Sequence, residues 1–303
     1  METRIGPRIV IVGGGIGGVA TALGLRRLGI DFVLLEQAPA LEEVGAGLQL
    51  SPNAVHVLHW LGLAEALAEV AVAPDGLDIR SYKSGDQILW TPLGEAAVRE
   101  FGVPYYHAHR ADLLAILVRS LGLERVRLGC RAIGFDQSAS AVTVHLESGE
   151  TVTGDALIGA DGIHSMVRAQ LFGDGEPQRS STAWRGLVDA ERIADLDIGR
   201  VSGTWWGPGR SFVHYFVSGG AKLNWVGIVP SDDDSIESWS ATGRVEDALA
   251  AFDGWHPRVR SIILATDRLM RSAVRDREPL ETWVESRIAL LGDAAHAMLP
   301  HHA

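Results

Sequence analysis

The chain has 303 residues, of which 47% are hydrophobic and 21% are charged, and this composition excludes disordered, collagen-like and disulfide-rich proteins. Lysine and arginine total 27 against 38 aspartates and glutamates, so the net charge of −11 makes nucleic acid and anionic membranes poor partners. The single cysteine, Cys130, excludes an internal disulfide, and the first residues lack a long apolar stretch, so we expect a cytoplasmic protein.

The first predicted elements are a strand, a glycine-rich turn, a helix and a second strand. Arg8–Val12 is a β-branched run without polar interruption, which is typical of a parallel strand buried on both faces. Apolar residues recur at helical spacing over Ile16–Leu28, and Gly29 follows where a helix commonly ends. Phe32–Glu36 is a second buried strand. Parallel strands joined in this way need a right-handed crossover.

The middle of the chain predicts two further helices, a hairpin and another buried strand. Ser51–Leu67 begins with an N-cap serine and a proline at the first helical position, and Asp112–Leu121 is the second helix. Ala141–Glu147 and Thr151–Thr153 flank a glycine-containing turn and predict the hairpin. Asp155–Gly159 has the buried-strand composition of the first elements.

Beyond about residue 180 the pattern changes to alternating segments rich in tryptophan and valine, separated by glycine-containing turns. These segments predict an antiparallel sheet of a second domain: Val201–Trp206, Phe212–Val217 and Leu223–Val229. The acidic run at 232–234 suits a solvated loop. Ile288–Leu291 returns to the buried-strand composition of the first domain, so we expect that domain to be discontinuous in sequence.

A glycine motif, Gly13-x-Gly15-x-x-Gly18, lies between the first strand and the first helix, and Glu36 ends the second strand. Glycines let the backbone turn tightly and approach a pyrophosphate, while the helix N-terminus offers free N–H groups and a positive dipole end. A carboxylate at the second strand end accepts hydrogen bonds from ribose hydroxyls. The motif therefore predicts a dinucleotide site, without distinguishing FAD from NAD.

This motif sets the expected fold class and domain boundaries. We expect an α/β protein with a discontinuous Rossmann-like cofactor-binding domain and a second domain built on an antiparallel sheet. The cofactor-binding domain comprises residues 1–73, 104–179 and 272–303, and the second domain comprises residues 74–103 and 180–271.

Two later segments place an aspartate directly after a buried strand. Asp161 and Gly162 follow the strand that begins at Asp155, and an aspartate there could serve only to cap the next helix. Asp293 follows the strand that begins near Ile288. In open α/β sheets, ligands bind at the carboxyl ends of strands, so both aspartates are candidate cofactor ligands.

Taken in order, the segments GGGIGG, Glu36, GADGIHSMVR and LLGDAAHAMLP resemble the single-component FAD-dependent aromatic hydroxylases, the group A flavoprotein monooxygenases. The likeness extends to VGAGLQLSPNA from Val44, HRADLL from His109 and DREPLETWVESR from Asp276. It covers nearly the whole chain and is nearest to the salicylate and 3-hydroxybenzoate hydroxylase branch.

The resemblance implies a cofactor and a role for each motif residue. FAD would be held at its ADP half by Gly13, Gly15, Gly18 and Glu36, and along its ribityl chain by Asp293. Arg110 would contact the pyrophosphate or flavin, and Asp161 with Gly162 would serve both FAD and a transient NADH or NADPH.

The resemblance also implies the reaction. The nicotinamide would reduce the flavin, and O₂ would add to form a C4a-hydroperoxide. A small phenolic ring, expected to carry a carboxylate, would attack the distal oxygen of that hydroperoxide. The protein would orient the ring and keep water away from the reacting atoms, which predicts a closed, largely apolar pocket.

Three residues of one strand are the catalytic candidates. Alternation places Ser211 and Tyr215 on one face and His214 on the other. Relatives in this branch often carry histidine at the position of Ser211 and tyrosine at that of Tyr215, so Tyr215 is the leading substrate-side candidate. A histidine at the position of Ser211 could act as the base on the phenol and serine cannot, so the resemblance does not carry over the usual substrate or the usual deprotonation route. His214 is a titratable alternative, although a partly buried, hydrogen-bonded histidine is the simpler interpretation.

Other residues carry two interpretations each. The tryptophans Trp205, Trp206 and Trp225 line the pocket or form core, and core is the default for aromatic residues on alternating strands. Arg185 has a role toward a substrate carboxylate or the flavin, or is a plain surface arginine. The histidines His296, His301 and His302 match no known metal-site spacing, so no metal is predicted.

The likeness breaks at the end of the chain. Relatives continue past the Gly-Asp motif with a glycine-containing loop and a helix that faces the cofactor, so a truncated form with weaker FAD binding is expected. The alternative function is a flavoprotein remnant that acts as a non-catalytic binding or partner protein. A flavin halogenase is disfavoured because the expected W-x-W-x-I-P string is absent. The acidic, apolar-rich surface permits a homodimer.

Overall fold

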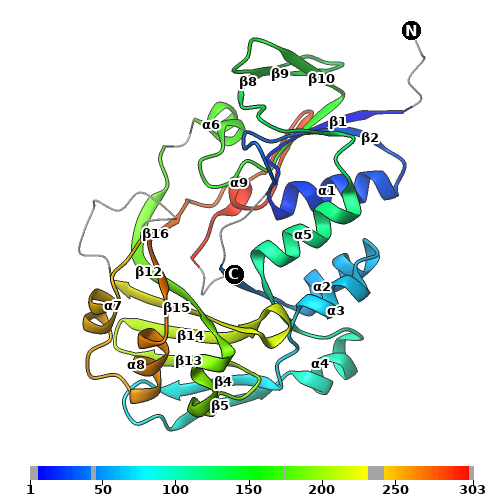
Figure 1. The fold of residues 1–303 in the computed structure, drawn as a ribbon. Coiled ribbons are helices and arrows are strands. Elements are labelled where there is room, and N and C mark those ends of the chain that lie inside the picture. The colour runs from blue at the N-terminus through cyan, green and yellow to red at the C-terminus, as the bar shows by residue number, and fades with distance from the viewer. Residues whose placement is uncertain (1–5, 42–45, 174, 231–241, 300–303) are drawn as a thin grey trace. The chain divides into compact units, whose positions relative to one another are not determined.

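The computed structural model describes residues 6–41, 46–173, 175–230 and 242–299, and Figure 1 shows its elements. The chain divides into two compact units. The first comprises Met1–Glu43, Leu114–Arg179 and Arg275–Ala303, and the second comprises Val44–Leu113 and Ser180–Val274. The acidic run at 232–234 lies outside the described residues.

The first unit is built on a six-stranded sheet in the order β17-β18-β11-β1-β2-β7. The strands are β1 (Arg8–Val12), β2 (Asp31–Leu35), β7 (Val126–Arg127), β11 (Ala156–Gly159), β17 (Val284–Glu285) and β18 (Ile288–Leu290). All neighbouring pairs are parallel except β17 with β18. Segments from three distant parts of the chain thus share one parallel sheet, which confirms the expected discontinuous Rossmann-like arrangement.

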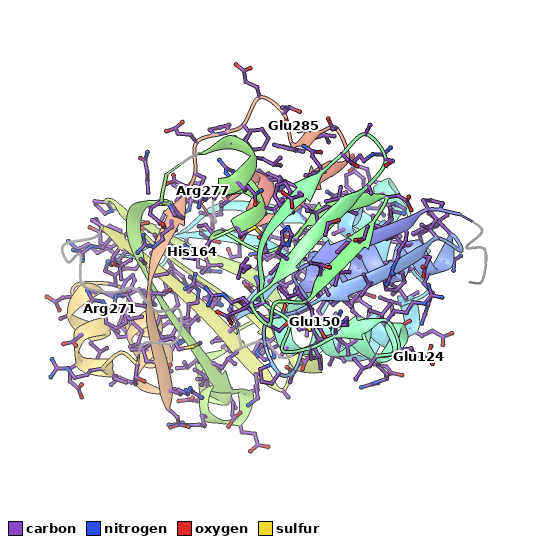
Figure 2. The ribbon with its side chains drawn as sticks, turned by 90° about the horizontal axis from the view of Figure 1, so that it is seen from above. Glu124, Glu150, His164, Arg271, Arg277 and Glu285 are labelled. Atoms are coloured by element: carbon purple, nitrogen blue, oxygen red, sulfur yellow. The ribbon has the colours of Figure 1, made fainter. Side chains whose placement is uncertain are left out.

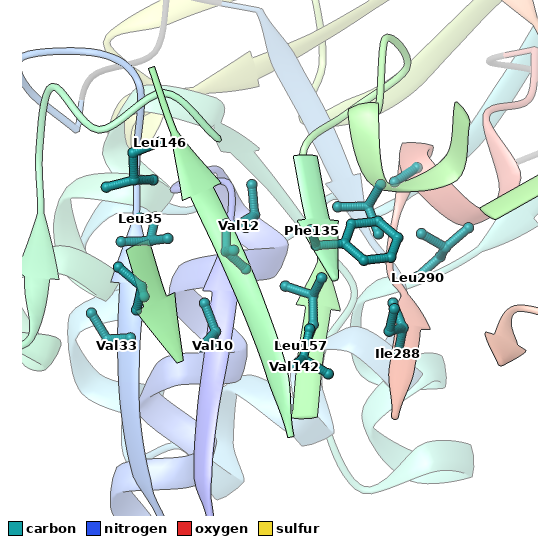
Figure 3. Packing of buried hydrophobic residues seen from close by; sticks show 14 of the residues in the cluster. Val10, Val12, Val33, Leu35, Phe135, Val142, Leu146, Leu157, Ile288 and Leu290 are labelled. Carbon is teal, nitrogen blue, oxygen red and sulfur yellow. The ribbon is translucent and has the colours of Figure 1, made fainter. Parts of the chain in front are cut away.

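A second, three-stranded sheet packs on the first and closes a hydrophobic core. Its strands are β8 (Ala132–Gln137), β9 (Val142–Leu146) and β10 (Thr151–Gly154), in the order β10-β9-β8. Figure 3 shows Val10 and Leu157 of the parallel sheet among the buried side chains of this cluster, together with Phe135 and Val142. The helices of the unit are α1 (Ile16–Arg27), α6 (Met166–Phe172), α9 (Asp293–His296) and most of α5 (Arg110–Leu121).

The second unit is built on a seven-stranded sheet in the order β16-β12-β15-β14-β13-β4-β5. The strands are β4 (Gly76–Ser81), β5 (Gln87–Pro92), β12 (Gln178–Asp189), β13 (Val201–Gly207), β14 (Arg210–Val217), β15 (Lys222–Pro230) and β16 (Arg268–Asp276). The predicted antiparallel pairing holds for β13 with β14 and for β14 with β15, and β12, which the sequence did not predict, pairs antiparallel with β15. The sheet is nevertheless mixed, because β4 runs parallel to β13.

Helices cover one face of this sheet. The helices α7 (Val245–Ala251) and α8 (Pro257–Leu264) supply Ala248, Val259, Ile262 and Ile263 to a core with aromatic residues of the sheet. Figure 1 shows both helices beside β13, β14 and β15. Two 3₁₀ turns, at Ala190–Leu196 and Ser218–Gly220, complete the connections.

A two-stranded ribbon, β3 (Gly47–Leu50) with β6 (Tyr106–His109), also belongs to the second unit. It lies against the sheet, since Gly47 approaches Tyr215 of β14 and the ring of His107 packs on the same tyrosine. For this reason residues 44–73 and 104–113 fall in the second unit, whereas the sequence assigned them to the cofactor-binding domain.

The helix predicted over Ser51–Leu67 is two helices, α2 (Pro52–Trp60) and α3 (Ala64–Val70). Gly62 has φ +84° and turns the chain between them, and the N–H of Leu63 donates to the Leu58 carbonyl oxygen. A glycine in this left-handed conformation is a common way to end a helix. A further helix, α4 (Gly94–Phe101), follows β5. Among the described residues, no helix is both long enough and apolar enough to cross a lipid bilayer.

Candidate active site

In the first unit, the ends of three parallel strands bring three separate segments of the chain together. The Ala160 N–H donates to the Val12 carbonyl oxygen over 2.8 Å, and the Leu291 N–H donates to that of Gly159 over 2.9 Å. The glycine turn after β1 therefore lies beside the Asp161 segment after β11, which in turn lies beside the Asp293 segment after β18. The carboxyl edge of such a sheet is where open α/β folds bind ligands.

The glycines of the first segment are required by close backbone contact. Gly13 has φ +108°, and a Cβ on it would lie 2.2 Å from the carbonyl oxygen of Ala160. A Cβ on Gly18 would lie 1.9 Å from the carbonyl oxygen of Gly13. Both distances are far below van der Waals contact, so only glycine keeps this geometry.

Gly15 has the opposite environment and faces open space. None of the described residues lies within 4 Å of a Cβ built on it, and it forms the N-cap of α1 without a side chain that could cap the first N–H groups. An α-helix leaves its first four N–H groups without an intrahelical partner, and they favour an anion. Together with the glycine turn, this uncapped end of a 12-residue helix fits a dinucleotide pyrophosphate.

The Glu36 carboxylate holds the glycine turn in place. Its Oε2 accepts from the Gly14 N–H over 2.6 Å and its Oε1 accepts from the Ala38 N–H over 2.8 Å. Each carboxylate oxygen can accept more than one hydrogen bond, so ribose hydroxyls remain acceptable partners. The role of Glu36 toward the cofactor stays a prediction. Its hydrogen bond with the glycine turn is an observed, structural contact.

Asp161 caps the following helix. Its Oδ1 accepts from the Ser165 hydroxyl over 2.5 Å and its Oδ2 from the Val167 N–H over 3.2 Å, while Ser165 Oγ accepts from the Arg168 N–H. Burial raises the pKa of the Asp161 carboxyl. This is the capping interpretation left open by the sequence. Gly162, next in the chain, has φ +76° and faces open space where a Cβ would be, and the cofactor roles of both residues stay predictions.

Buried or half-buried arginines join the three segments through backbone carbonyl groups. Arg168 of α6 is 1% exposed and donates to the carbonyl oxygens of Ala295 and Glu278 over 3.0 and 2.9 Å. Arg277, labelled in Figure 2, donates from Nε to the Ile163 carbonyl oxygen over 2.8 Å. Asp293 itself is exposed at the first position of α9, directly after Gly292.

In the second unit, Tyr215 lies in a corner between the seven-stranded sheet and the β3–β6 ribbon. It pairs in register with Asn224 of β15, whose Oδ1 accepts from the Gly47 N–H over 2.7 Å. The His107 ring lies 4.4 Å from the Tyr215 ring at an interplanar angle of 30°. A Cβ on Gly47 would lie 2.6 Å from Tyr215 Cε2, so glycine lets the ribbon close on the tyrosine.

The charges around Tyr215 favour an anion. Burial raises the pKa of the Tyr215 hydroxyl and Tyr105 adds to this effect, whereas Arg185 and Arg110 lower it. Burial also raises the pKa of Tyr105 to about 12, and its hydroxyl donates to Gln49 Oε1 over 2.5 Å. Two guanidinium groups close enough to act on one phenol would stabilise a phenolate or carboxylate there.

Arg185 is buried and not a surface arginine. It is 8% exposed and donates from its guanidinium to the hydroxyl of Ser272 on β16. Burial, followed by the charge of Arg110, lowers the pKa of Arg185 to about 10, which leaves it cationic near neutral pH. By strand register it shares the Tyr215 face, because Arg185 pairs with Val226 and Val226 pairs with Val213.

The other two catalytic candidates lie where the strand alternation predicts. Ser211 is half-buried on the Tyr215 face, in register with Trp206 and Ile228. His214 is 4% exposed on the opposite face, 6.3 Å from the Phe212 ring, and its buried Nδ1 has no hydrogen-bond partner in the described part of the chain. Burial lowers the pKa of His214 to about 4. The aromatic side chains that surround this histidine favour a structural role.

The remaining candidates separate into core and surface. Trp205 and Trp225 are buried in the helix-covered core, while Trp206 is 53% exposed. His296 packs on the Trp283 ring at 5.0 Å. Within the described ranges no group of three histidine, cysteine, aspartate or glutamate side chains could hold a metal, and His301 and His302 lie outside them.

Several residues of the Tyr215 corner were not singled out by the sequence: Gly47, Gln49, Tyr105, His107, Asn224 and Ser272. Four of them lie in segments with a visible signal, namely the glycine-containing VGAGLQL and the aromatic YYHAH. Asn224 and Ser272 carry no local pattern, because only the register of strands distant in sequence brings them to this face.

Comparison with known proteins gives the same picture of both units. Residues 7–303 match the family model described as an FAD binding domain. The chain is 39% identical to the 3-amino-4-hydroxybenzoate 2-monooxygenase of Streptomyces cremeus over 97% of this chain and 73% of that protein. It is 37% identical to the 3-hydroxybenzoate 6-hydroxylase of Klebsiella oxytoca over 98% of this chain and 75% of that protein.

A solved structure is similar over the same length. HpxO of Klebsiella pneumoniae, determined in complex with FAD and uric acid, superposes with a TM-score of 0.86 at 29% sequence identity. The match covers 97% of this chain and 74% of that chain. The fold of this chain thus recurs in a protein that binds FAD.

Proposed function

This chain belongs to the FAD-binding-domain family of aromatic-ring hydroxylases, and on that premise we propose how its two units divide the work. The protein is an FAD-dependent monooxygenase that uses NADH or NADPH and O₂. In our proposal the glycine cradle of the first unit holds FAD and the Tyr215 corner of the second unit receives the aromatic substrate. The comparisons give no support to the alternative of a non-catalytic remnant.

The observation that carries the proposal is the meeting of three segments at one sheet edge. Gly13 and Gly18 let the backbone of the turn pack closely, Gly15 leaves open space at the uncapped end of α1, and Glu36 stands directly after the neighbouring strand β2. The neighbouring segments would contribute Asp161, Gly162 and Asp293, and Arg110 stays a predicted contact of the cofactor. The fit rests on a backbone cradle that any Cβ would fill and on an uncapped helix end.

When bound, FAD supplies the redox chemistry, which transfers one atom of O₂ to the ring with reducing equivalents from NADH or NADPH. The protein's share is binding and orientation. Burial is the largest effect on the Tyr215 phenol and raises its pKa, while the positive charges of Arg185 and Arg110 act in the opposite direction and would attract an anionic ring. The Tyr215 hydroxyl would orient a polar ring substituent. Half-buried Val213 and Ile228 on the same face would exclude water.

The substrate class we propose is a six-membered aromatic ring that carries a hydroxyl and a carboxylate. Both relatives named above act on hydroxybenzoates, according to their names. The positive charge at the Tyr215 corner supports the same chemistry. Ser211 cannot serve as the imidazole base of the related branch, so we assign the ionisation of the phenol to the field of the two arginines and keep Ser211 as a candidate hydrogen-bonding residue.

The test is a visible spectrum followed by a product analysis. The purified protein, supplied with FAD, is expected to show bound-flavin absorption bands. It should also oxidise NADH or NADPH faster with 3-amino-4-hydroxybenzoate or 3-hydroxybenzoate, and yield a ring with one added hydroxyl. A colourless protein that takes up no FAD, or hydrogen peroxide as the sole product with both rings, would contradict the proposal.

We also keep two broader predictions. The acidic, apolar-rich surface permits a homodimer, and sedimentation velocity would measure it. A cytoplasmic location is expected from the sequence, and fractionation of cells that express the protein would test it.

A further inference from the structure

His107 is fixed against Tyr215 from the ribbon side. Its backbone N–H and carbonyl oxygen both bond to Val72, each over 2.8 Å, so its main chain has little freedom. The side chain is 1% exposed, and its ring lies 4.4 Å from the Tyr215 ring and 5.9 Å from the Tyr105 ring. The imidazole is therefore one wall of the corner that holds the tyrosine.

The fold itself does not use the Nε2 atom of this imidazole. Nε2 is buried, and no atom of the described residues forms a hydrogen bond with it. An unsatisfied buried polar group lowers stability, whereas a phenylalanine ring at the same place would stack on Tyr215 without that cost. Buried polar atoms without a partner are rare in folded proteins, and they occur preferentially at functional sites.

Two further polar atoms near the same tyrosine lack a partner among the residues that the structure describes. Asn224, opposite Tyr215 on β15, uses its Oδ1 to bind Gly47, while its buried Nδ2 makes no such bond. On the other neighbouring strand, β13, Ser202 precedes Gly203, and Gly203 pairs with His214. The Ser202 Oγ is also buried without a hydrogen-bond partner among the described residues. The strand register thus places Ser202 and Asn224 on the two strands beside Tyr215, and His107 packs on it from the ribbon.

Burial disfavours the protonated form of the His107 imidazole. Burial, with a smaller effect from His214, lowers the pKa of His107 to about 3. At neutral pH the ring is therefore uncharged, and its nitrogens can donate or accept hydrogen bonds without changing protonation state. Its contribution is to orientation.

We propose that His107 is a positioning residue: its ring holds Tyr215 from the ribbon side, and its Nε2, which has no partner among the described residues, is available to hydrogen-bond the aromatic substrate that Tyr215 orients. This inference rests on the proposed function, because Tyr215 is taken as the substrate-side residue. A role in packing alone would need only an aromatic ring at position 107.

The test compares His107→Phe, which keeps the ring and removes the nitrogens, with His107→Gln, which keeps a nitrogen and removes the ring. His145→Phe, at a half-exposed histidine of β9, is the control for the loss of a histidine elsewhere. The readouts are the thermal midpoint, the bound-flavin absorption, and the hydroxylated product formed per NADH consumed with 3-hydroxybenzoate or 3-amino-4-hydroxybenzoate.

For His107→Phe we expect an unchanged or higher thermal midpoint and unchanged flavin binding, with a fall in product per NADH of about threefold or more and a smaller change in KM. His107→Gln should recover part of that loss, and His145→Phe should match the parent protein. If His107→Phe forms as much product per NADH as the wild-type protein, the proposal is overturned. An equal fall in product per NADH in both His107 variants would also overturn it.

The stability measurement decides the physical premise without any turnover. If His107→Phe unfolds or melts clearly lower than the parent, the nitrogen serves the fold and the inference is wrong. Absence of product from the parent protein with both rings would instead count against the proposed function, while the thermal midpoints would still support or overturn the premise about Nε2.

Discussion

The cofactor cradle of the first unit is made mostly of backbone, whereas the Tyr215 corner of the second unit is made of side chains. Gly13 and Gly18 permit carbonyl oxygens to come within 2.2 and 1.9 Å of where a Cβ would be. Around Tyr215, by contrast, the contacts are ring against ring and amide against main chain. The backbone cradle tolerates no side chain at Gly13 or Gly18, while a side-chain corner can be altered one group at a time.

The largest expected effect is therefore a side chain placed in the cradle. Gly13→Val should weaken FAD binding by about 100-fold or more, because its Cβ would collide with the Ala160 carbonyl group and φ +108° disfavours any β-branched residue. Flavin absorption after gel filtration measures the loss. Gly175→Ala, at a glycine with open space and no positive φ, is the matched control in the same unit. Retained flavin in Gly13→Val would show that the cradle is not the site.

The second effect separates the units by function. Tyr215→Phe should lower the yield of hydroxylated product by about tenfold or more, the equivalent of one lost hydrogen bond to a positioned group, and leave flavin binding intact. Product per NADH and flavin absorption are measured on the same sample. Equal loss of both would show that Tyr215 supports the fold or the cofactor and not the substrate.

A smaller effect is expected where the ribbon closes on the tyrosine. Gly47→Ala would place a Cβ 2.6 Å from Tyr215 Cε2 and from Asn224 Cγ, so one of these side chains must move. We expect KM for the aromatic substrate to rise about threefold, with flavin binding unchanged. Gly199→Ala, at a surface glycine with an ordinary contact of 3.7 Å, is the control. An unchanged KM would mean that the corner has more room than the contact distances indicate.

The last effect concerns stability at low pH and the two buried histidines. His107 and His214 have folded-state pKa values of about 3 and about 4, below the ordinary 6.5, so the unfolded chain takes up protons that the folded chain does not. Stability is complete above about pH 6.5 and falls as the pH drops toward those values, by up to about 1.4 kcal/mol per pH unit for each histidine.

Urea unfolding at a series of pH values measures this slope. His214→Phe should flatten it by the contribution of one histidine, because His214 lies among the aromatic side chains of the helix-covered core. An equal slope in parent and variant would show that the His214 ring already takes up a proton in the folded protein.

The contrast between the units also explains what the sequence could reveal. The turn with Gly13, Gly15 and Gly18 is a local backbone requirement, so it leaves a local pattern, and the strands at Arg8–Val12 and Ile288–Leu290 are found where their composition predicts. The capping contact of Asp161 was also foreseeable, since Ser165 and Val167 are its near neighbours in sequence.

The Tyr215 corner could be predicted only in part. Alternation placed Ser211 and Tyr215 on one strand face, but nothing near them indicated Asn224, His107 or Ser272. Those residues meet through strand register and through the ribbon, and each comes from a different part of the chain. The long strand β12 and the parallel pairing of β4 with β13 could not be predicted for the same reason, because pairing between distant strands leaves no periodic signal.

The most direct test of the account is the fate of molecular oxygen. The FAD-supplied protein is given NADH, an aromatic hydroxy acid that it turns over, and isotopically labelled dioxygen, and the ring product is analysed by mass spectrometry. The account predicts that the newly added hydroxyl carries the label. An unlabelled hydroxyl, with the oxygen drawn from water, would contradict it.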